Sequence, residues 1–361
     1  MTLDASRMFV LDTHCDTPSQ ILRLRDLSLD NHHAHVDFPK LMQGGVDGVF
    51  FALYVPAALK TDDAMAYAEK MLAGVKKAVA DNADRVAFAR SYNEASANKA
   101  KSITSIFLGL ENGSPIGHSL DRLHYFYDNG VRYVTLCHSA DNQICDSCAS
   151  VVGKWGGLSP FGRDMIREMN EIGMLVDLSH ASDETFYDVL ETSSRPVVAT
   201  HSCCRALCDH PRNMTDDMIR ALAQAGGVIQ INFYPMFLDS GFRKVLHETD
   251  IVERGERVEN EFIADPGNPA KRAAWNAVQD ELNALKRPSY RRIADHIDHV
   301  VDLVGIEHVG IGSDFDGIEV TPSGMDDISM MPVLFDELRT RGYSESDITA
   351  IAGLNFFRVL G

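Results

Sequence analysis

The sequence predicts a (β/α)8 barrel. Eight short apolar stretches recur along the 361 residues, and seven of them are followed by a segment with helical character. These stretches are continuously apolar instead of alternating, as expected for parallel strands buried on both faces. No G-x-G-x-x-G pattern follows the first stretch, which disfavours an open dinucleotide-binding sheet.

The first half of the chain contains the first three predicted strands. The first begins at Phe9 and ends before Pro18, and residues 17–45 are then polar and irregular in pattern. A second strand is predicted at 46–54 and a third at 105–110. Between them, residues 63–80 carry apolar residues at steps of three and four, which predicts a helix.

The repeat continues through the middle of the chain. Strands are predicted at 131–136, 174–178, 196–200 and 228–233, and helices at 118–128, 160–172, 182–192 and 215–225. Gly173 and Gly226 follow two of these helices at the position where glycine commonly ends a helix.

Residues 235–287 interrupt the repeat. They are charged, contain two prolines and include a helical piece near 270–286, so we expect an excursion that packs over the site. Helix 289–304 and strand 308–312 complete the barrel, and residues 330–361 form a helical tail in which Ser344 and Asp347 resemble a capping box. We expect residues 1–361 to form a single catalytic domain.

Composition excludes several classes of partner. Lys and Arg number 34 and Asp and Glu number 52, so the net charge of −18 argues against nucleic-acid binding. The seven cysteines cannot all pair internally, and reduced thiols are the simplest interpretation. The N-terminus carries Asp4 and Arg7 but no apolar region typical of a signal peptide. No apolar stretch is long enough to span a bilayer, so we expect a cytoplasmic protein without a membrane partner.

Ionisable residues follow six of the predicted strands. The chemistry of a (β/α)8 barrel lies at the carboxyl ends of its strands, so these residues should converge. A single histidine or carboxylate there is commonly structural, but six such strand ends would repel one another or stay unpaired unless cations hold them together. The residues concerned are His14, Asp16, Glu111, His138, His180, His201 and Asp314.

Histidine and carboxylate side chains suit zinc. Three histidines and two carboxylates exceed one tetrahedral site, whereas two zinc ions sharing a bridging carboxylate accommodate them and leave room for a water. The sequence therefore predicts a two-metal hydrolase.

Several motifs, in their order along the chain, resemble the renal (membrane) dipeptidase family, peptidase family M19, and specifically a soluble microbial-type member. The matching stretches are DTHCD at 12–16, GLENG at 109–113, VRYVTLCH at 131–138, VDLSH at 176–180, THS at 200–202, PRN at 211–213, NFY at 232–234, HVGIGSDFDG at 308–317 and NFFRVL at 355–360. The resemblance implies a binuclear zinc dipeptidase, and the likeness points to a homodimer.

The resemblance also implies roles for individual residues. His14 and Asp16 would hold one zinc ion, His180 and His201 the other, and Glu111 would bridge them together with a water or hydroxide that acts as nucleophile. His138, Arg212, Asp314 and Tyr234 would face the dipeptide substrate.

Physical chemistry suggests what the substrate-facing residues do. His138 would stabilise the oxyanion, Asp314 would shuttle the proton, and Arg212 would grip the C-terminal carboxylate. Because Arg212 would contact the carboxylate and not the side chain of the C-terminal residue, a D residue at that position should be tolerated.

The chain departs from the family pattern in places, and other interpretations stay open. Cys15 lies between two predicted ligands and should point away from them, and Cys203 and Cys204 stand where the family usually has small residues. One alternative is another metal-dependent barrel hydrolase, acting on lactones, cyclic amides or phosphate esters. Another is a metal-stabilised barrel that binds peptides without turnover, although a binding protein needs neither His138 nor Asp314.

Overall fold

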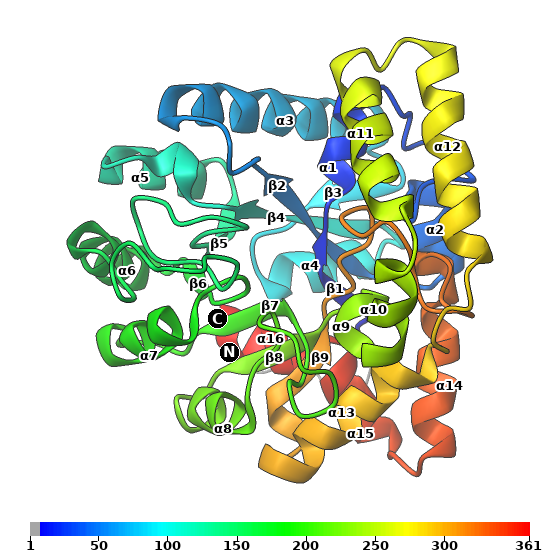
Figure 1. Ribbon diagram of the computed structural model, residues 1–361. Helices are drawn as coiled ribbons and strands as arrows, with labels where there is room; N and C mark the ends of the chain where they lie inside the picture. Colours follow the sequence, from blue (N-terminus) through cyan, green and yellow to red (C-terminus); the bar gives the residue numbers. More distant parts are fainter. Residues whose placement is uncertain (1–7) are drawn as a thin grey trace.

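Eight parallel strands form the barrel in a computed structural model that describes residues 8–361 (Figure 1). Each strand pairs in parallel with the next along the path β1-β2-β4-β5-β6-β7-β8-β9, which confirms the predicted (β/α)8 fold. The strands are β1 (Leu11–Cys15), β2 (Gly48–Tyr54), β4 (Thr104–Glu111), β5 (Val131–Thr135), β6 (Leu175–Asp177), β7 (Val198–Ser202), β8 (Val228–Ile231) and β9 (Val309–Ile311).

The barrel closes where β9 meets β1. The backbone N–H of Asp314 donates to the carbonyl of His14 at 3.0 Å, and the N–H of Asp16 donates to the carbonyl of Phe315 at 2.8 Å. The Thr13 hydroxyl adds a bond of 3.0 Å to the carbonyl of Ile311. The first and last strands are therefore joined beside the residues that end them.

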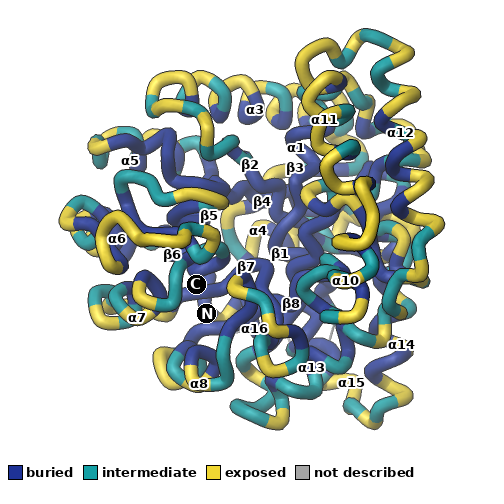
Figure 2. The backbone as a smooth tube through the Cα atoms, viewed as in Figure 1, coloured by how far each residue is buried: buried dark blue, intermediate teal, exposed yellow. Residues whose placement is uncertain are grey.

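Helices surround the strands, with buried inner faces and exposed outer faces (Figures 1 and 2). The main ones are α3 (Thr61–Asp81), α5 (Leu120–Asp128), α6 (Pro160–Ile172), α7 (Asp183–Thr192), α8 (Asp216–Gln224), α13 (Arg291–Val304) and α14 (Met331–Thr340). Gly173 is in the left-handed conformation as the C-cap of α6, as the sequence predicts.

Four short elements differ from the prediction. Residues 17–45, expected to be irregular, contain α1 (Thr17–Leu22) and α2 (Phe38–Gln43), and a strand β3 (Val86–Phe88) and helix α4 (Tyr92–Lys99) lie between β2 and β4. β3 pairs in parallel with the start of β4 and is not one of the strands along the barrel path. Elements of three to eight residues contain too few turns for a hydrophobic period to reveal them.

The predicted excursion is a helical layer. It comprises α9 (Pro235–Leu238), α10 (Ser240–His247), α11 (Ile251–Ala264) and α12 (Pro269–Ala284), more helix than the one piece expected. The α11–α12 pair projects beyond the helical ring (Figure 1) and shares a small apolar core with α10. Arg23, just after α1, pairs with Glu259 at 2.6 Å, so the layer also reaches the start of the barrel.

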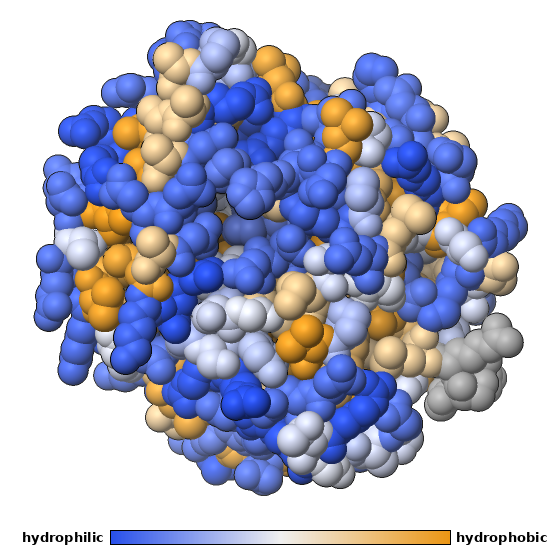
Figure 3. Space-filling model, turned by 90° about the vertical axis from the view of Figure 1, so that its right-hand side faces the viewer, coloured by the Kyte–Doolittle hydropathy of each residue, from blue (hydrophilic) through white to orange (hydrophobic). Residues whose placement is uncertain are grey.

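The face over α12 and α14 is largely hydrophilic, with apolar residues in separate groups (Figure 3). No helix among residues 8–361 is both long and apolar enough to cross a membrane. The expectation about a signal peptide rests on residues 1–7, which lie outside the described residues. All seven cysteines are unpaired.

The C-terminal tail fills the amino-terminal end of the barrel. The tail contains α15 (Glu345–Thr349), which begins with the predicted capping box of Ser344 and Asp347, and α16 (Asn355–Leu360). Phe356 packs 5.2 Å from the Phe50 ring of β2, and Phe357 packs 5.1 Å from Phe9. These aromatic rings leave the opposite end of the barrel for polar side chains.

Asn355 fastens this tail to β9. Its side-chain amide donates to the carbonyls of Ile306 at 2.7 Å and Val309 at 2.8 Å, and it is buried. We expect Asn355→Ala to lower the free energy of unfolding by roughly 1–3 kcal/mol, because two carbonyls lose their donor. Urea unfolding would measure this, with Asn260→Ala at an exposed position of α11 as the control, expected to change stability by about 0.5 kcal/mol or less.

Candidate metal centre

Glu111, the last residue of β4, lies at the centre of a cluster of buried side chains. Its Oε1 atom lies 3.1 Å from His180 Nε2 and 3.4 Å from His201 Nε2. Its Oε2 atom lies 3.4 Å from His14 Nε2. The two oxygens of one carboxylate therefore face histidines from different strand ends, His14 on one side and His180 with His201 on the other, as a bridging ligand would.

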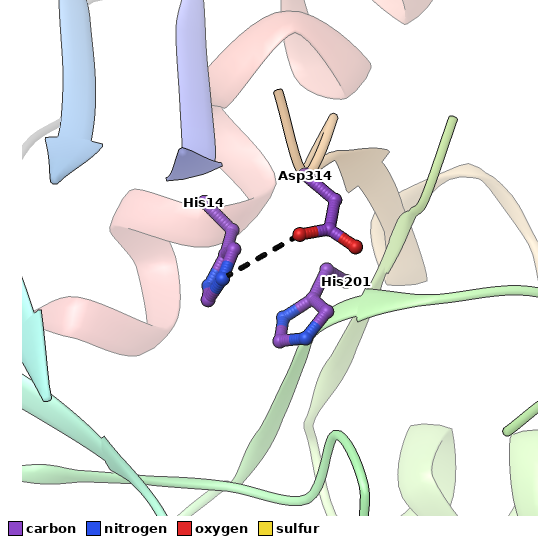
Figure 4. Close-up of side chains that lie close together, drawn as sticks. All are labelled: His14, His201 and Asp314. Atoms are coloured by element: carbon purple, nitrogen blue, oxygen red, sulfur yellow. Dashed lines mark ion pairs between the residues drawn. The ribbon is translucent and has the colours of Figure 1, made fainter. Parts of the chain in front are cut away.

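β1 supplies the group on the Oε2 side. His14 Nε2 lies 3.5 Å from Asp16 Oδ2. It also lies 3.9 Å from Asp314 Oδ1, with the His201 ring nearby (Figure 4). Asp16 stands just past the strand, but its carboxylate still faces the same point as His14. Cys15 points away as predicted, with its Sγ 3.6 Å from the Ser313 hydroxyl.

β6 and β7 supply the group on the Oε1 side. The Nε2 atoms of His180 and His201 face each other at 3.0 Å. His180 adopts a positive φ of 69°, a conformation that costs a non-glycine residue energy and that often occurs at functional sites. In this conformation the His180 imidazole faces Glu111 and His201.

The cluster fits metal ions. Donor atoms 3.0–3.5 Å apart match the ligand spacing of a tetrahedral zinc site, about 3.3 Å for Zn–N bonds near 2.0–2.1 Å. His14 Nε2 and Asp16 Oδ1 are buried without a hydrogen-bond partner, which is costly unless a cation satisfies them. Every predicted ligand except His180 is at most 5% exposed.

Burial and mutual repulsion shift the titration of these groups. Burial, followed by the Glu111 charge, raises the pKa of Asp16 to about 6, and burial with the Asp16 charge raises the pKa of Asp314 to about 7. Burial opposes a charge on His14, but the Glu111 and Asp16 carboxylates outweigh it and hold its pKa well above the ordinary value. Burial lowers the pKa of His201 well below that value, so its imidazole is neutral and able to bind a cation.

Asp314 is positioned by residues that the sequence analysis did not single out. Asn232 donates its side-chain amide to Asp314 Oδ2 at 2.8 Å, which leaves Oδ1 facing the cluster. A Cβ atom on Gly317 would lie 2.1 Å from Asp16 Oδ2 and 2.6 Å from Asp314 Oδ1, so only glycine fits there. Asn232 lies just after β8 but inside the strand predicted at 228–233, so its place in the NFY motif at 232–234 was the available signal.

His138 lies at the edge of the cluster. Its Nε2 is 3.9 Å from Glu111 Oε1, and its ring packs against Tyr54 and His180 at centroid distances of 4.8 and 4.2 Å. Burial, followed by the positive charge of Arg212, lowers the pKa of His138 to about 3. The neutral ring is partly exposed, so it can donate a hydrogen bond to a bound molecule.

Arg212 and Tyr234 lie further from Glu111. The guanidinium of Arg212 donates to the carbonyl of His201 at 3.0 Å and lies 5.4 Å from the Phe237 ring, while its Nε is buried without a partner. Tyr234 packs edge-on against Phe237 at 5.0 Å, and burial and a hydrogen bond to Glu319 raise its pKa well above the ordinary value. Its link to the site is through the backbone, since the Tyr234 N–H donates to Asn232 Oδ1 at 2.6 Å.

The cysteines after His201 occupy apolar surroundings. Cys203 and Cys204 are fully buried, with their Sγ atoms 3.2 Å from the carbonyl of Asn232 and 3.6 Å from that of His296. Neither belongs to a group of potential metal ligands in the described part of the chain. Both pack in the main hydrophobic core of the barrel.

Comparison with known sequences gives matches along nearly the whole chain. A sequence model of the membrane dipeptidase family, peptidase family M19, matches residues 5–361. Dipeptidase verJ of Clonostachys rogersoniana is 35% identical over 337 residues, covering 91% of this chain and 75% of that protein. An uncharacterized dipeptidase of Schizosaccharomyces pombe is 30% identical over 377 residues, covering 97% of this chain and 80% of that protein.

Solved structures agree with the sequence matches. Dipeptidase AC, a family M19 metallopeptidase, superposes with a TM-score of 0.80 at 26% identity, covering 98% of each chain. A metallopeptidase from Rhodobacter sphaeroides, bound to a phosphinate mimic of L-Ala-D-Ala, also gives a TM-score of 0.80, at 25% identity and with 98% of each chain covered. A relationship that extends over the whole barrel and its strand-end cluster shows that the chain belongs to the M19 membrane dipeptidase family and is a metal-dependent dipeptidase.

Proposed function

We propose that this metallodipeptidase binds two zinc ions and cleaves dipeptides with a free C-terminal carboxylate. His14 and Asp16 would hold one ion, His180 and His201 the other, and Glu111 would bridge them. The observation that carries the proposal is that the two oxygens of Glu111 face these two groups at 3.1–3.4 Å. Ions bound there would lower the pKa of a water toward 7 and polarise the substrate carbonyl.

Asp314 would move the proton. Its Oδ2 is held by Asn232, so Oδ1 stays directed at the point where the Glu111 and His14 side chains meet. There it can accept a proton from the attacking water and transfer it to the nitrogen of the breaking peptide bond. The amine then leaves neutral, and Asp314 returns to its starting charge.

His138 would stabilise the negative charge that develops on the substrate carbonyl oxygen. Its imidazole is neutral, so Nε2 can carry a hydrogen and donate it to that oxygen. Tyr54 and His180 pack against its ring and restrict its orientation. A donor fixed in advance costs no reorganisation when the charge forms.

Arg212 would bind the C-terminal carboxylate. Its guanidinium is held by the His201 carbonyl and stacked near Phe237, and the buried Nε–H has no acceptor of its own. A carboxylate can accept from this edge in a bidentate manner. The grip does not involve the side chain beside the carboxylate, so D residues would be accepted, in line with the L-Ala-D-Ala mimic in the Rhodobacter sphaeroides enzyme. We propose that Tyr234 lines the same side of the substrate.

A cytoplasmic location and a homodimer stay predictions from the sequence. A two-fold dimer is the commonest assembly of soluble oligomers. Light scattering after gel filtration would give the mass to compare with 39.9 kDa per chain.

The purified protein should contain two zinc ions per chain. His201→Ala removes one proposed ligand, so we expect it to retain about one ion and lose turnover while staying folded. Mass spectrometry of metal content, with circular dichroism as the control for folding, would check both. One ion or none in fully loaded unmutated protein would contradict the two-metal proposal.

Asp314→Asn should keep both metals and lower kcat by about 10²–10⁴-fold, because an amide cannot accept the proton of the attacking water. Asp302→Asn, an equivalent change at an exposed position of α13, should leave kcat unchanged. Steady-state kinetics alongside metal analysis would compare them. Near-normal kcat in Asp314→Asn would remove this residue from the proton transfer.

Arg212→Ala should lower kcat/KM for dipeptides by at least about 30-fold, chiefly through KM, because truncating one partner of a buried charge pair costs 2–5 kcal/mol. It should also abolish the preference for free acids over C-terminal amides. The exposed Arg220→Ala serves as the control. If the unmutated enzyme cleaves L-Xaa-D-Xaa amides as fast as the acids, the carboxylate is not what Arg212 recognises.

A further inference from the structure

We propose that Tyr133 is a positioning residue that orients His14 for one metal ion. Thr200, together with Asp177, orients His201 for the other. The inference rests on the two-metal assignment proposed above. It follows from the hydrogen bonds made by the ring nitrogens that face away from the cluster.

Tyr133 fixes the ring of His14. The phenol oxygen lies 2.9 Å from His14 Nδ1 and 3.2 Å from the carbonyl oxygen of Thr13. A carbonyl can only accept, so the single phenol hydrogen goes to Thr13 and His14 donates from Nδ1 to the phenol oxygen. In the neutral imidazole, the form that binds a metal ion, Nε2 then has no hydrogen and its lone pair faces Glu111 and Asp16.

Gly109 makes the reach of Tyr133 possible. It lies beside Tyr133 in the register of β4 and β5. A Cβ atom at position 109 would lie 2.2 Å from the Tyr133 ring and 2.5 Å from its hydroxyl. The absence of a side chain on β4 therefore lets the ring on β5 cross toward β1.

Asp177 and Thr200 fix the ring of His201 in the same sense. Asp177 accepts from the Thr200 and Thr135 hydroxyls at 2.7 and 2.6 Å and from the backbone N–H groups of Thr200 and Ser179 at 2.8 and 3.1 Å. The only hydroxyl hydrogen of Thr200 is thus committed to Asp177.

His201 must therefore be the donor in its own bond to Thr200. The Thr200 oxygen lies 2.9 Å from His201 Nδ1 and accepts from it. This leaves His201 Nε2 with a free lone pair directed at Glu111 and His180.

The two supports share no residue. Tyr133 and Gly109 act on His14, whereas Asp177 and Thr200 act on His201. Removing either should therefore weaken one zinc ion more than the other. Partners of this kind typically contribute 10–100-fold to metal affinity.

The test measures zinc affinity by competition with a chromophoric chelator, starting from metal-free full-length protein. Tyr133→Phe and Thr200→Val should each weaken one of the two zinc dissociation constants by about 10–100-fold. Gly109→Ala should act like Tyr133→Phe, and Thr200→Ser should restore the affinity lost in Thr200→Val. The matched controls are Tyr92→Phe and Thr104→Val, buried residues without contact to the cluster, which should leave both constants unchanged.

A His14→Ala background identifies which ion responds. In that background the zinc ion that stays bound should respond to Thr200→Val and not to Tyr133→Phe. Unchanged affinities in both single variants, or equal weakening of both sites by each, would overturn the inference. If the unmutated protein binds only one zinc ion, both the two-metal proposal and this inference are wrong. If it binds two ions and turns over normally, but Tyr133→Phe leaves both zinc dissociation constants unchanged, only this inference is wrong. Should Thr200→Val fail to fold, Asp177→Asn tests the same support.

Discussion

The carboxylate of Glu111 is the constraint around which the site is organised. It is buried at the end of β4, and the Nε2 atoms of four histidines from four other strand ends lie 3.1–3.9 Å from its oxygens. A buried anion is tolerated only where positive charge or hydrogen bonds compensate it. Burial lowers the pKa of His180 and His201, so these two imidazoles are neutral and bring no positive charge to Glu111, whereas bound cations would supply it. One buried carboxylate thus brings histidines from four other strand ends to a single point.

Local strain and close contacts collect at this end of the barrel. His180 and Asp314 adopt positive φ angles of 69° and 65°, and Asn112, next to Glu111, adopts 73°. Such conformations persist only where surrounding contacts hold them in place. The amino-terminal end, by contrast, is filled with aromatic rings in ordinary packing. The two ends of the barrel therefore differ in character, one being packed with aromatic rings and the other holding residues in unusual backbone conformations.

The sequence predicted those features that depend on a single stretch of the chain, such as a strand or the residue that follows it. Buried parallel strands appear as continuous apolar runs, and an ionisable residue directly after such a run, as at His14 or Glu111, is conspicuous. Contacts between side chains on different strands could not be predicted in this way. The reach of Tyr133 to His14 depends on Gly109 across the sheet, a dependence that only the register reveals. The elements β3 and α4 were missed because they are short. The excursion at 235–287 and its helix near 270–286 were predicted, whereas α9, α10 and α11 were not.

The seam between β9 and β1 has a consequence for how the enzyme comes into being. The backbone bonds that close the barrel involve His14, Asp16 and Asp314, three members of the cluster contributed by segments about 300 residues apart in the sequence. Pairings between such distant segments are costly in chain entropy and tend to form late in folding. A growing or partly unfolded chain therefore has no assembled site, and any hydrolytic activity reports that the first and last strands have met. Catalytic competence in this barrel doubles as a signal of completed folding.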